Sequence, residues 1–324
     1  MMIHGTRRDF IRTSGSCLAW LLGLQAAAPA FARRLFAAQR GQPVAREPWG
    51  RIERVADGIW ALISTPLEDR TTLCNGGIVR GRTGLLVIES FARPEGAAWL
   101  ADQARTLTGR RPDHVVLTHY HGDHTAGIAG YARDDGAPQL HLTERTRELV
   151  RTQDAGRGGA PVPARGRLLD AATILPAATT DSIDLGDRHV TITPHDGHTA
   201  SDVTIEIADP AVVFCGDLVW NRMFPNYVDA VPSRLSHAVR ALQRETDATY
   251  VPGHGPLADA TALRDYVALI DDVEAAARRA HERGMTAADA AKEYRLPAAM
   301  AEWTLFNPRY FEVAIEAWLE ELRA

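Results

Sequence analysis

The chain has 324 residues, of which 45% are hydrophobic and 24% charged, and its formal net charge is −5. This composition excludes a mainly disordered, collagen-like or coiled-coil protein. The acidic balance argues against a nucleic-acid partner, which a basic surface would hold. With only three Cys, a disulfide framework is also excluded.

The N-terminus resembles a bacterial twin-arginine export signal. Arg7 and Arg8 are followed by a mildly apolar run over residues 17–30, and Ala30-Phe31-Ala32 offers a cleavage site. We therefore expect a signal peptide over residues 1–32 and a periplasmic protein. The apolar run is too short to remain as a membrane span after cleavage. The alternative is an ordinary basic arm followed by an apolar helix.

The next segments predict a first unit of strands followed by a helix. Residues 33–50, which are polar and rich in Arg and Pro, are expected to form a loose leader or linker. Strand-like runs follow over residues 52–65, 74–81 and 83–90. Residues 94–109 have apolar side chains at helical spacing and end at a Gly, which predicts a helix. A further strand begins at residue 114.

The second half of the chain repeats this order. Residues 143–152 are expected to be helical, and residues 155–168, rich in Gly, Pro and Arg, to form a mobile surface loop. Strands follow over residues 189–220, a helix over residues 232–245 and a last strand near residue 250. This pattern predicts an α/β protein in which two αβ halves pack sheet to sheet with helices outside.

Residues 259–324 form a C-terminal helical extension in this prediction. Thr286 and Asp289 have the spacing of a capping box. The extension also carries five aromatic residues, which are expected either to pack on the parent domain or to form a homodimer surface. They are Trp303, Phe306, Tyr310, Phe311 and Trp318. Cys74 and Cys215 lie in apolar strand-like runs, and we expect two separate buried thiols.

The strongest chemical signal is the segment Thr-His-Tyr-His-Gly-Asp-His at residues 118–124. Its three His and one Asp follow an apolar strand directly. A tight loop at a strand end can direct such side chains to a shared point, and imidazole and carboxylate groups are ligands of zinc. Three later metal-capable residues stand beside small residues at or near the ends of apolar runs. They are His198, Asp217 and His254.

The motifs HxHxDH, GHT, GD and PGHG, in this order, resemble the metallo-β-lactamase superfamily. The resemblance covers residues 51–258 and implies an αββα sandwich with a metal site at one edge of its sheets. The family pattern, carried to this sequence, assigns His119, His121 and His198 to a first metal. It assigns Asp123, His124 and His254 to a second, with Asp217 bridging the two.

The resemblance implies a metallo-hydrolase. Two divalent ions, expected to be Zn²⁺ although Fe and Mn are not excluded, would activate a bridging hydroxide and polarise the scissile bond. Asp123 would also orient this nucleophile. The expected substrate is a small ester, lactone, thioester or amide, and β-lactam hydrolysis is expected only as a side activity.

The ligand set narrows the choice of branch. His124 and Asp217 occur together in the glyoxalase II, lactonase and RNA-processing branches. Glyoxalase II differs around its last His and uses Lys and Arg to hold glutathione, whereas Lys292 is the only Lys here. Glu89 stands where the family usually has Asp. We expect Glu89 to orient a metal ligand, and Thr199, beside His198, to support the site.

The substrate contacts are less specified by the sequence. Four residues after the bridging Asp are candidates: Trp220, Arg222 and Phe224 for substrate binding and Tyr227 as a donor to a developing oxyanion. Their alternative role is in the hydrophobic core. Arg70 and Arg222 can hold a carboxylate. His195, three residues before His198, is not used by the family pattern and is expected near the ligands or at the surface.

Two other functions compete with the hydrolase. The first is a mononuclear iron persulfide dioxygenase, which shares the fold and part of the ligand set. The second is a metal-binding sulfur-carrier or scaffold protein without turnover. A set of seven ligands favours two metal ions over one.

Overall fold

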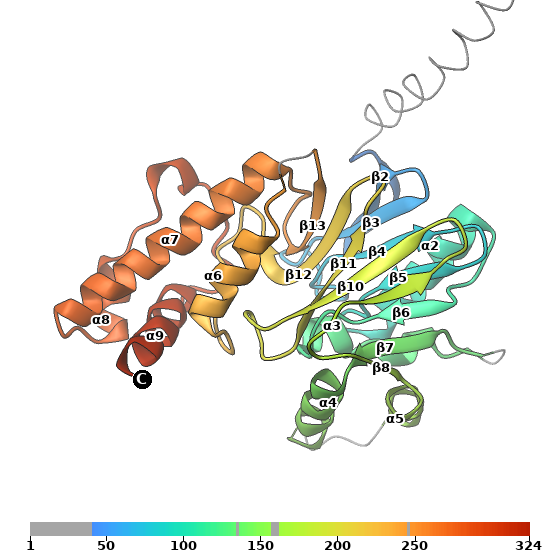
Figure 1. The fold of residues 1–324 in the computed structure, drawn as a ribbon, viewed down its shortest axis with the longest axis horizontal. Coiled ribbons are helices and arrows are strands. Elements are labelled where there is room, and N and C mark those ends of the chain that lie inside the picture. The colour runs from blue at the N-terminus through green and yellow to red at the C-terminus, as the bar shows by residue number, and fades with distance from the viewer. Residues whose placement is uncertain (1–40, 134–135, 157–161, 245–246) are drawn as a thin grey trace, which may run out of the picture.

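The computed structural model describes residues 41–133, 136–156, 162–244 and 247–324. The predicted signal peptide, residues 1–32, lies outside them. Two sheets are stacked in the centre of the molecule, and helices lie on both outer sides (Figure 1). This is the αββα sandwich that the repeated order of strands and helices predicts.

The first sheet contains eight strands in chain order. They are β1 (Pro43–Glu47), β2 (Gly50–Ala56), β3 (Ile59–Ser64), β4 (Gly76–Arg80), β5 (Leu85–Ile88), β6 (His114–Val116), β7 (Gln139–Thr143) and β8 (Thr173–Leu175). Strands β1 to β5 pair antiparallel, and β5 to β8 pair parallel. The parallel strands bring the loops after β5 and β6 to the same edge of the sheet.

One boundary of the sequence interpretation is corrected by this sheet. The expected leader, residues 33–50, is described only from residue 41, and residues 43–47 are strand β1 rather than a loose segment. The register pairs Glu47 with Gly50 and Arg46 with Arg51. The polar composition misled the prediction because β1 is an edge strand with mostly exposed side chains.

The second sheet contains five strands, in the order β13-β12-β11-β10-β9. They are β9 (Asp181–Asp184), β10 (His189–His195), β11 (Asp202–Ile207), β12 (Val212–Trp220) and β13 (Thr249–His254). Strands β12 and β13 pair parallel, and the register shifts between Phe214 and Gly216 and again before Trp220. This irregularity falls at Asp217, in the middle of a strand whose nine residues are all buried.

Short helices and one long helix accompany the first sheet. They are α2 (Pro94–Thr108), α3 (Gly122–Thr125), η1 (Ile128–Tyr131), α4 (Glu144–Gly156) and α5 (Pro163–Asp170). Helix α2 ends before Gly109, the stop that the sequence predicted, and the φ of 75° at Gly109 is the left-handed conformation that glycine adopts easily. The expected mobile loop over residues 155–168 is partly wrong, because α5 begins at Pro163.

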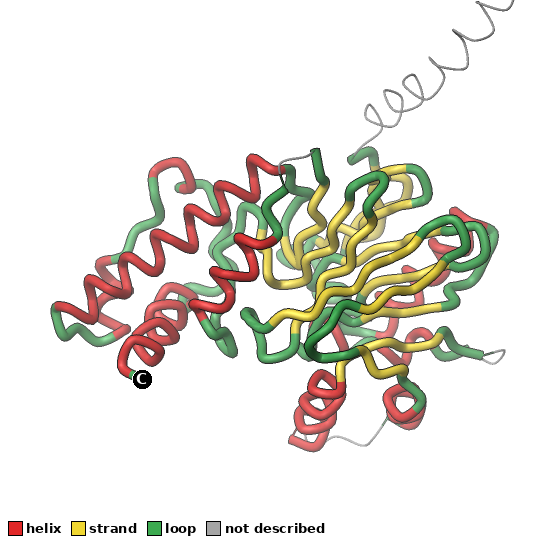
Figure 2. Tube along the Cα trace, in the orientation of Figure 1, coloured by secondary structure: helices red, strands yellow, loops and turns green. Residues whose placement is uncertain are grey.

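The C-terminal helices are α6 (Pro232–Ala241), α7 (Ala260–Glu282), α8 (Ala287–Glu293), η2 (Ala298–Met300) and α9 (Tyr310–Arg323). In Figure 2 the C-terminal helices form a group at one side of the molecule, in which α6 and α7 lie against the second sheet and α8 and α9 pack with α7 farther out. Thr286 caps α8 by accepting a hydrogen bond from the Asp289 amide, as the capping box predicts. The chain between η2 and α9 is irregular, where a nearly continuous helix was expected.

Three hydrophobic clusters hold these layers together. One fills the space between the two sheets, a second lies between the first sheet and α2, and the third joins β12 and β13 to α6, α7 and α9. The aromatic residues of the extension pack against the third cluster, which is the first of the two expected arrangements. Burial of this apolar area is the main force that attaches the extension to the sandwich.

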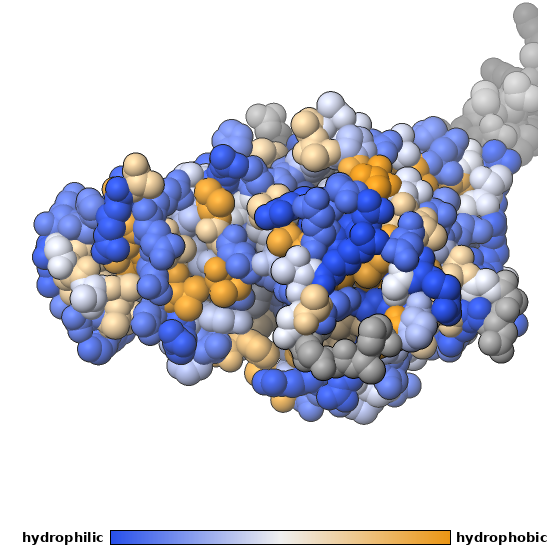
Figure 3. Space-filling view, turned by 90° about the horizontal axis from the view of Figure 1, so that it is seen from below, coloured by the Kyte–Doolittle hydropathy of each residue, from blue (hydrophilic) through white to orange (hydrophobic). Residues whose placement is uncertain are grey.

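The two described cysteines are unpaired, and the visible surface is mostly polar. Cys74 and Cys215 are free and buried, as expected. The face seen in Figure 3 is mostly hydrophilic, with hydrophobic residues scattered between. None of the helices among the described residues is both long enough and apolar enough to span a bilayer.

Candidate metal centre

Seven His and Asp side chains meet at one edge of the sandwich. The first sheet supplies His119 and His121 from the loop after β6, and Asp123 and His124 from α3. The second sheet supplies His198 from the bend between β10 and β11, Asp217 from β12 and His254 from the end of β13. Segments that are distant in sequence therefore contribute to one site.

The ligand atoms form two groups. His119, His121, His198 and Asp217 make one group, and Asp123, His124 and His254 make the other, with the candidate ligand atoms of each group within 4.8 Å of one another. Asp217 connects the groups, because its Oδ1 lies 3.1 Å from His124 Nε2 and its Oδ2 3.2 Å from His254 Nε2 and 3.4 Å from His198 Nε2. All but His121 and Asp123 are buried.

Glu89 orients two of these rings. Its Oε1 lies 3.0 Å from His124 Nδ1 and also accepts a hydrogen bond from the Thr118 hydroxyl, whose oxygen lies 3.0 Å from His119 Nδ1. If both rings carry their proton on Nδ1, they donate to Glu89 and Thr118 and turn Nε2 toward the site. Glu89 has φ 73°, a strained conformation for a residue with a side chain, directly after β5.

Asp229 orients a third ring. Its Oδ2 lies 2.8 Å from His121 Nε2 and accepts a hydrogen bond from the Tyr120 hydroxyl. The other ring nitrogen, His121 Nδ1, lies 3.0 Å from His198 Nε2. A proton on His121 Nε2 is thus used by the carboxylate, which leaves Nδ1 as the atom available to a cation.

Glycines allow the two sheets to approach at the centre. A Cβ on Gly253 would lie 1.9 Å from Asp217 Oδ1, and one on Gly216 would lie 2.7 Å from Thr118 Oγ1. Gly216 also has φ 52°. Only glycine permits these backbone approaches without displacing Asp217 and Thr118.

An aromatic ring covers His254. The Trp220 and His254 ring centroids are 3.9 Å apart with an interplanar angle of 31°, which is a stacked arrangement. Trp220 is 3% exposed and thereby also restricts the position of the His254 ring.

The site concentrates opposing charges. Burial disfavours a charged His254 ring, but the Asp217 and Asp123 carboxylates outweigh it and raise the pKa of His254 to about 9. Burial likewise opposes ionisation of Asp217, yet the rings of His254 and His124 hold its pKa well below the ordinary value. Burial lowers the pKa of His198 to about 3. The Asp217 and Asp123 carboxylates are thus ionised, and a buried ionised carboxylate needs positive charge beside it.

The residues fit metal ions. Among the described residues, His119 Nε2, His254 Nε2 and Asp217 Oδ1 are buried without a hydrogen-bond partner, although buried polar atoms are normally paired. These are atoms that the orientation of the rings and of β12 directs to the centre. A group of three His and one Asp, and a second of two His and one Asp, matches the nitrogen and oxygen ligands of zinc-like cations.

A cavity of about 580 Å³ opens above the two groups. Its walls combine polar site residues with apolar ones. They include His121, Asp123, Asp217, His254, Asn226, Asp229, Gln153, Pro66, Leu73, Val228, Trp220, Phe306 and Tyr310. A small organic molecule can therefore reach the candidate ligands.

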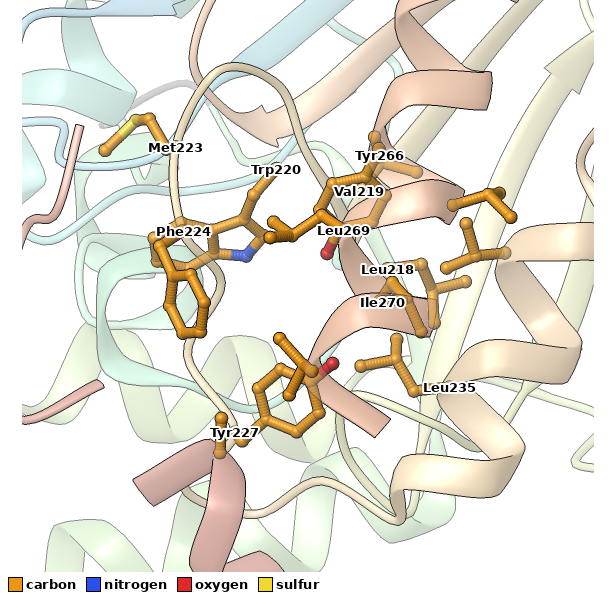
Figure 4. Close-up of a cluster of buried hydrophobic side chains, with 14 of the residues drawn as sticks. Leu218, Val219, Trp220, Met223, Phe224, Tyr227, Leu235, Tyr266, Leu269 and Ile270 are labelled. Atoms are coloured by element: carbon orange, nitrogen blue, oxygen red, sulfur yellow. The ribbon is translucent and has the colours of Figure 1, made fainter. Parts of the chain in front are cut away.

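Three proposed substrate contacts are corrected by the structure. Tyr227 is 1% exposed and Phe224 fully buried, and both point into the cluster beside α7 and α9 rather than into the cavity (Figure 4). Arg222 is exposed and lines a separate depression. The loop turns sharply at Arg222, where φ is 55°, so residues that are close in sequence face different sides. Of the four candidates, only Trp220 lines the cavity.

The other predicted positions have local partners. The Thr199 amide and hydroxyl donate to the Asp202 carboxylate, so Thr199 fixes the bend that carries His198. His195 lies 3.0 Å from the Thr204 hydroxyl and belongs to neither ligand group. Arg70 is exposed and does not line the cavity.

Several contacts at the site were not found from sequence. Asp229 and Thr118 orient His rings, while Phe306 and Tyr310 bring the extension to the cavity. Thr118 is adjacent to the first His, and this adjacency was a usable signal. Nothing in the local pattern marks Asp229, and the aromatic cluster that includes Phe306 and Tyr310 was recognised without a link to the cavity.

Comparisons with known proteins point to one family. The family model described as "Metallo-beta-lactamase superfamily" matches residues 70–256. Hydroxyacylglutathione hydrolase of Acidiphilium cryptum is 30% identical over 221 residues, which are 68% of this chain and 79% of that protein. Acyl-coenzyme A thioesterase MBLAC2 of Homo sapiens is 27% identical over 213 residues, covering 60% and 75% of the two chains.

A solved structure supports the fold. The stereoselective inverting sec-alkylsulfatase Pisa1 from Pseudomonas sp. aligns with a TM-score of 0.65 at 16% identity, covering 83% of this chain and 50% of that one. At this identity the likeness concerns the fold alone. The sandwich architecture thus agrees between the sequence pattern, the structure and a solved structure of similar fold.

Proposed function

The chain belongs to the metallo-beta-lactamase superfamily and is a metallo-hydrolase, and from this premise we propose that it is a dinuclear zinc enzyme that hydrolyses a small thioester or related acyl compound. The observation that carries the proposal is the meeting of two ligand groups at Asp217, beneath an open cavity. One carboxylate between two groups suits two cations better than one.

The chemistry requires an activated water. Two bound ions would supply it by lowering the pKa of a shared water and by polarising the substrate carbonyl. His119, His121 and His198 would hold one ion and Asp123, His124 and His254 the other, with Asp217 between them. The acceptors Glu89, Thr118 and Asp229 keep the ligand rings in place before substrate arrives.

Asp123 is the residue proposed to orient the attacking water. Its carboxylate is 26% exposed toward the cavity, and its Oδ2 lies 3.4 Å from His254 Nε2. Burial opposes ionisation, but the His124 and His254 rings hold its pKa at about 2. An ionised carboxylate at this position can accept a hydrogen bond from water and set its direction of attack.

The thioester class is preferred over the other acyl compounds because of the relatives. Acyl-coenzyme A and acylglutathione are both thioesters, and the names of two relatives contain them. Esters, lactones and amides present the same carbonyl to the same centre and remain the other members of the proposed class. The thiol that leaves a thioester is a better leaving group than the alcohol of an ester or the amine of an amide.

Metal content provides the first test. Protein purified without added metal is expected to contain two equivalents of zinc by mass spectrometry, and Asp217→Ala and His254→Ala are expected to lose zinc. His195→Ala is the matched control, because His195 lies outside both ligand groups. One equivalent of iron, with oxygen uptake on a persulfide, would overturn the dinuclear hydrolase. Zinc without turnover on any acyl substrate would support a scaffold instead.

We also propose that the enzyme acts in the periplasm. The support is the pair Arg7 and Arg8 followed by an apolar run and Ala30-Phe31-Ala32. A reporter fused to residues 1–40 is expected to be exported. The same fusion with Arg7→Lys and Arg8→Lys is expected to stay in the cytoplasm. Export that is indifferent to this double substitution would overturn the twin-arginine route.

A further inference from the structure

Tyr310, like Phe306, belongs to the C-terminal extension and lines the cavity above the metal centre. It is the first residue of α9, and it lines the cavity together with Asp123, Asp217 and His254. Its ring meets the Trp220 ring edge to face, with centroids 6.1 Å apart, and Trp220 in turn stacks on His254. The ring therefore lies between the third hydrophobic cluster, against which it packs, and the cavity, whose wall it forms.

Backbone contacts fix Tyr310 relative to the centre. The Phe224 amide donates to the Thr304 carbonyl at 2.9 Å, and the Thr304 amide donates to the Arg222 carbonyl at 3.0 Å. These bonds tie the irregular segment before α9 to the loop that follows β12, the strand of Asp217. At the next residue of the helix, the Phe311 ring packs on Phe224 with centroids 4.7 Å apart. The position of Tyr310 is thus set from two sides.

Resting on the proposed hydrolase function, we propose that Tyr310 is a substrate-contacting residue whose hydroxyl donates a hydrogen bond to the carbonyl oxygen of the acyl group. Phe306, from the same segment, completes an apolar wall for the acyl chain. The C-terminal extension is then a part of the active site and not only a packed layer.

The Tyr310 hydroxyl is protonated near neutral pH and can therefore donate a hydrogen bond. Burial, followed by the Asp123 and Asp217 carboxylates, raises the pKa of Tyr310 to about 12, and all three residues line the same cavity. In hydrolysis a C–O bond forms to water, the C–S bond breaks, and the products are a carboxylic acid and a thiol. Tyr310 keeps its proton throughout and stabilises the charge that develops on the carbonyl oxygen.

The cavity favours a neutral acyl group. Asp123 and Asp217 are assigned to the metal ions, Asp229 adds a further carboxylate, and the described lining residues include neither Lys nor Arg. Leu73, Val228 and Phe306 offer apolar surface beside them. A short neutral acyl chain fits this wall. An acyl chain that carries a carboxylate would find no cationic side chain among the described lining residues to pair with.

The test compares two Tyr→Phe variants that each remove one hydroxyl. Tyr310→Phe alters the cavity, and Tyr227→Phe is the matched control because Tyr227 is buried in the core. The probe is S-ethyl thiobutyrate with zinc-loaded protein, and zinc content and melting temperature are measured for both. Tyr310→Phe is expected to lower kcat roughly 100-fold with little change in KM, while Tyr227→Phe stays near the wild-type value. Equal kinetics for the two variants would overturn the proposal.

A binding measurement separates this inference from the hydrolase function. Butyrate, the product acid, is titrated while tryptophan fluorescence is followed, and Tyr310→Phe is expected to weaken its affinity roughly 3- to 10-fold. If the wild-type protein hydrolyses no acyl probe, the function fails, but weaker butyrate binding in Tyr310→Phe alone still supports the contact. Unchanged butyrate affinity in an active enzyme overturns the role of Tyr310 and leaves the function intact.

Discussion

The metal centre and the C-terminal helical layer, α7 to α9, meet at Trp220 but use burial in opposite ways. The centre buries imidazole rings and carboxylates whose charges must be balanced. The layer buries aliphatic and aromatic side chains from α7 and α9 against β12 and β13. Burial of apolar groups stabilises a fold, whereas burial of charged groups does so only when partners are present.

This difference in what is buried shows which region stabilises the fold and which region carries the chemistry. The centre keeps Glu89 in a strained conformation and leaves ligand atoms without hydrogen bonds. Such features persist only where the surrounding structure holds them. The helical layer, the core between the sheets and the core under α2 supply that support. Substitutions in the two regions should therefore separate activity from stability.

Loss of the shared carboxylate is expected to have the largest effect. Asp217→Ala removes the carboxylate that lies within 3.4 Å of His198 in one group and of His124 and His254 in the other. Loss of the hydrogen-bond partner of a metal ligand lowers activity roughly 10- to 100-fold, and the rate of hydrolysis should fall by more than this when Asp217 is removed. The rise in melting temperature on adding zinc after chelation should also shrink, because weaker binding stabilises less. A variant with full zinc-dependent stabilisation would contradict the bridging role.

A cavity in the helical layer should act on stability instead. Leu269, on α7, is fully buried among the residues of Figure 4. Leu269→Ala is expected to lower the free energy of unfolding by about 2–5 kcal/mol, with zinc content unchanged well below the melting temperature. Denaturant unfolding measures the loss, and Leu67→Ala, at a Leu that is 72% exposed, is the control. Zinc loss in the folded Leu269→Ala protein would show that the regions are not separable.

The orienting carboxylate should give an intermediate effect on metal affinity. Glu89→Gln keeps the shape but weakens the acceptor for His124 Nδ1 and Thr118. Zinc affinity, measured by competition with a chromophoric chelator, should fall roughly 10- to 100-fold. Glu53→Gln, at another buried Glu that pairs with Arg51 on β2, is expected to leave it unchanged. An equal fall in both variants would assign the effect to general destabilisation.

A pair of His outside both regions predicts a pH dependence. His141 Nε2 lies 3.1 Å from His114 Nδ1, and burial, with the neighbouring His114, lowers the pKa of His141 from 6.5 to about 4. Between these values the unfolded chain binds more protons at His141 than the folded one, so the folded state loses stability as pH falls. Denaturant unfolding from pH 7 to pH 4 should show a shallower decline in His141→Gln. The exposed His189→Gln should retain the wild-type slope.

The smallest expected effect is at a helix cap. Thr286 accepts a hydrogen bond from the Asp289 amide at the start of α8. Thr286→Ala should reduce the free energy of unfolding by about 1 kcal/mol, without a change in zinc content or turnover. Thermal unfolding checks the loss. A change in turnover would show that α8 influences the cavity.

The sequence alone identified the family and the seven candidate ligands. His119 to His124 fall in one segment after a strand, and His198, Asp217 and His254 each stand beside small residues in short patterns. These signals are local: a ligand needs a polar side chain at a strand or loop position where glycine lets backbones approach. The same local logic predicted the order of the layers and the caps of α2 and α8.

Only the tertiary structure decided which aromatic residues reach the cavity. Tyr227 and Tyr310 have the same side chain, and Tyr227 is nearer in sequence to Asp217, yet Tyr227 is in the core and Tyr310 is at the wall. The reason is that the turn at Arg222 and the docking of α9 set the direction of each ring. Direction in space depends on contacts between distant segments, and these leave no periodic or local mark in the sequence.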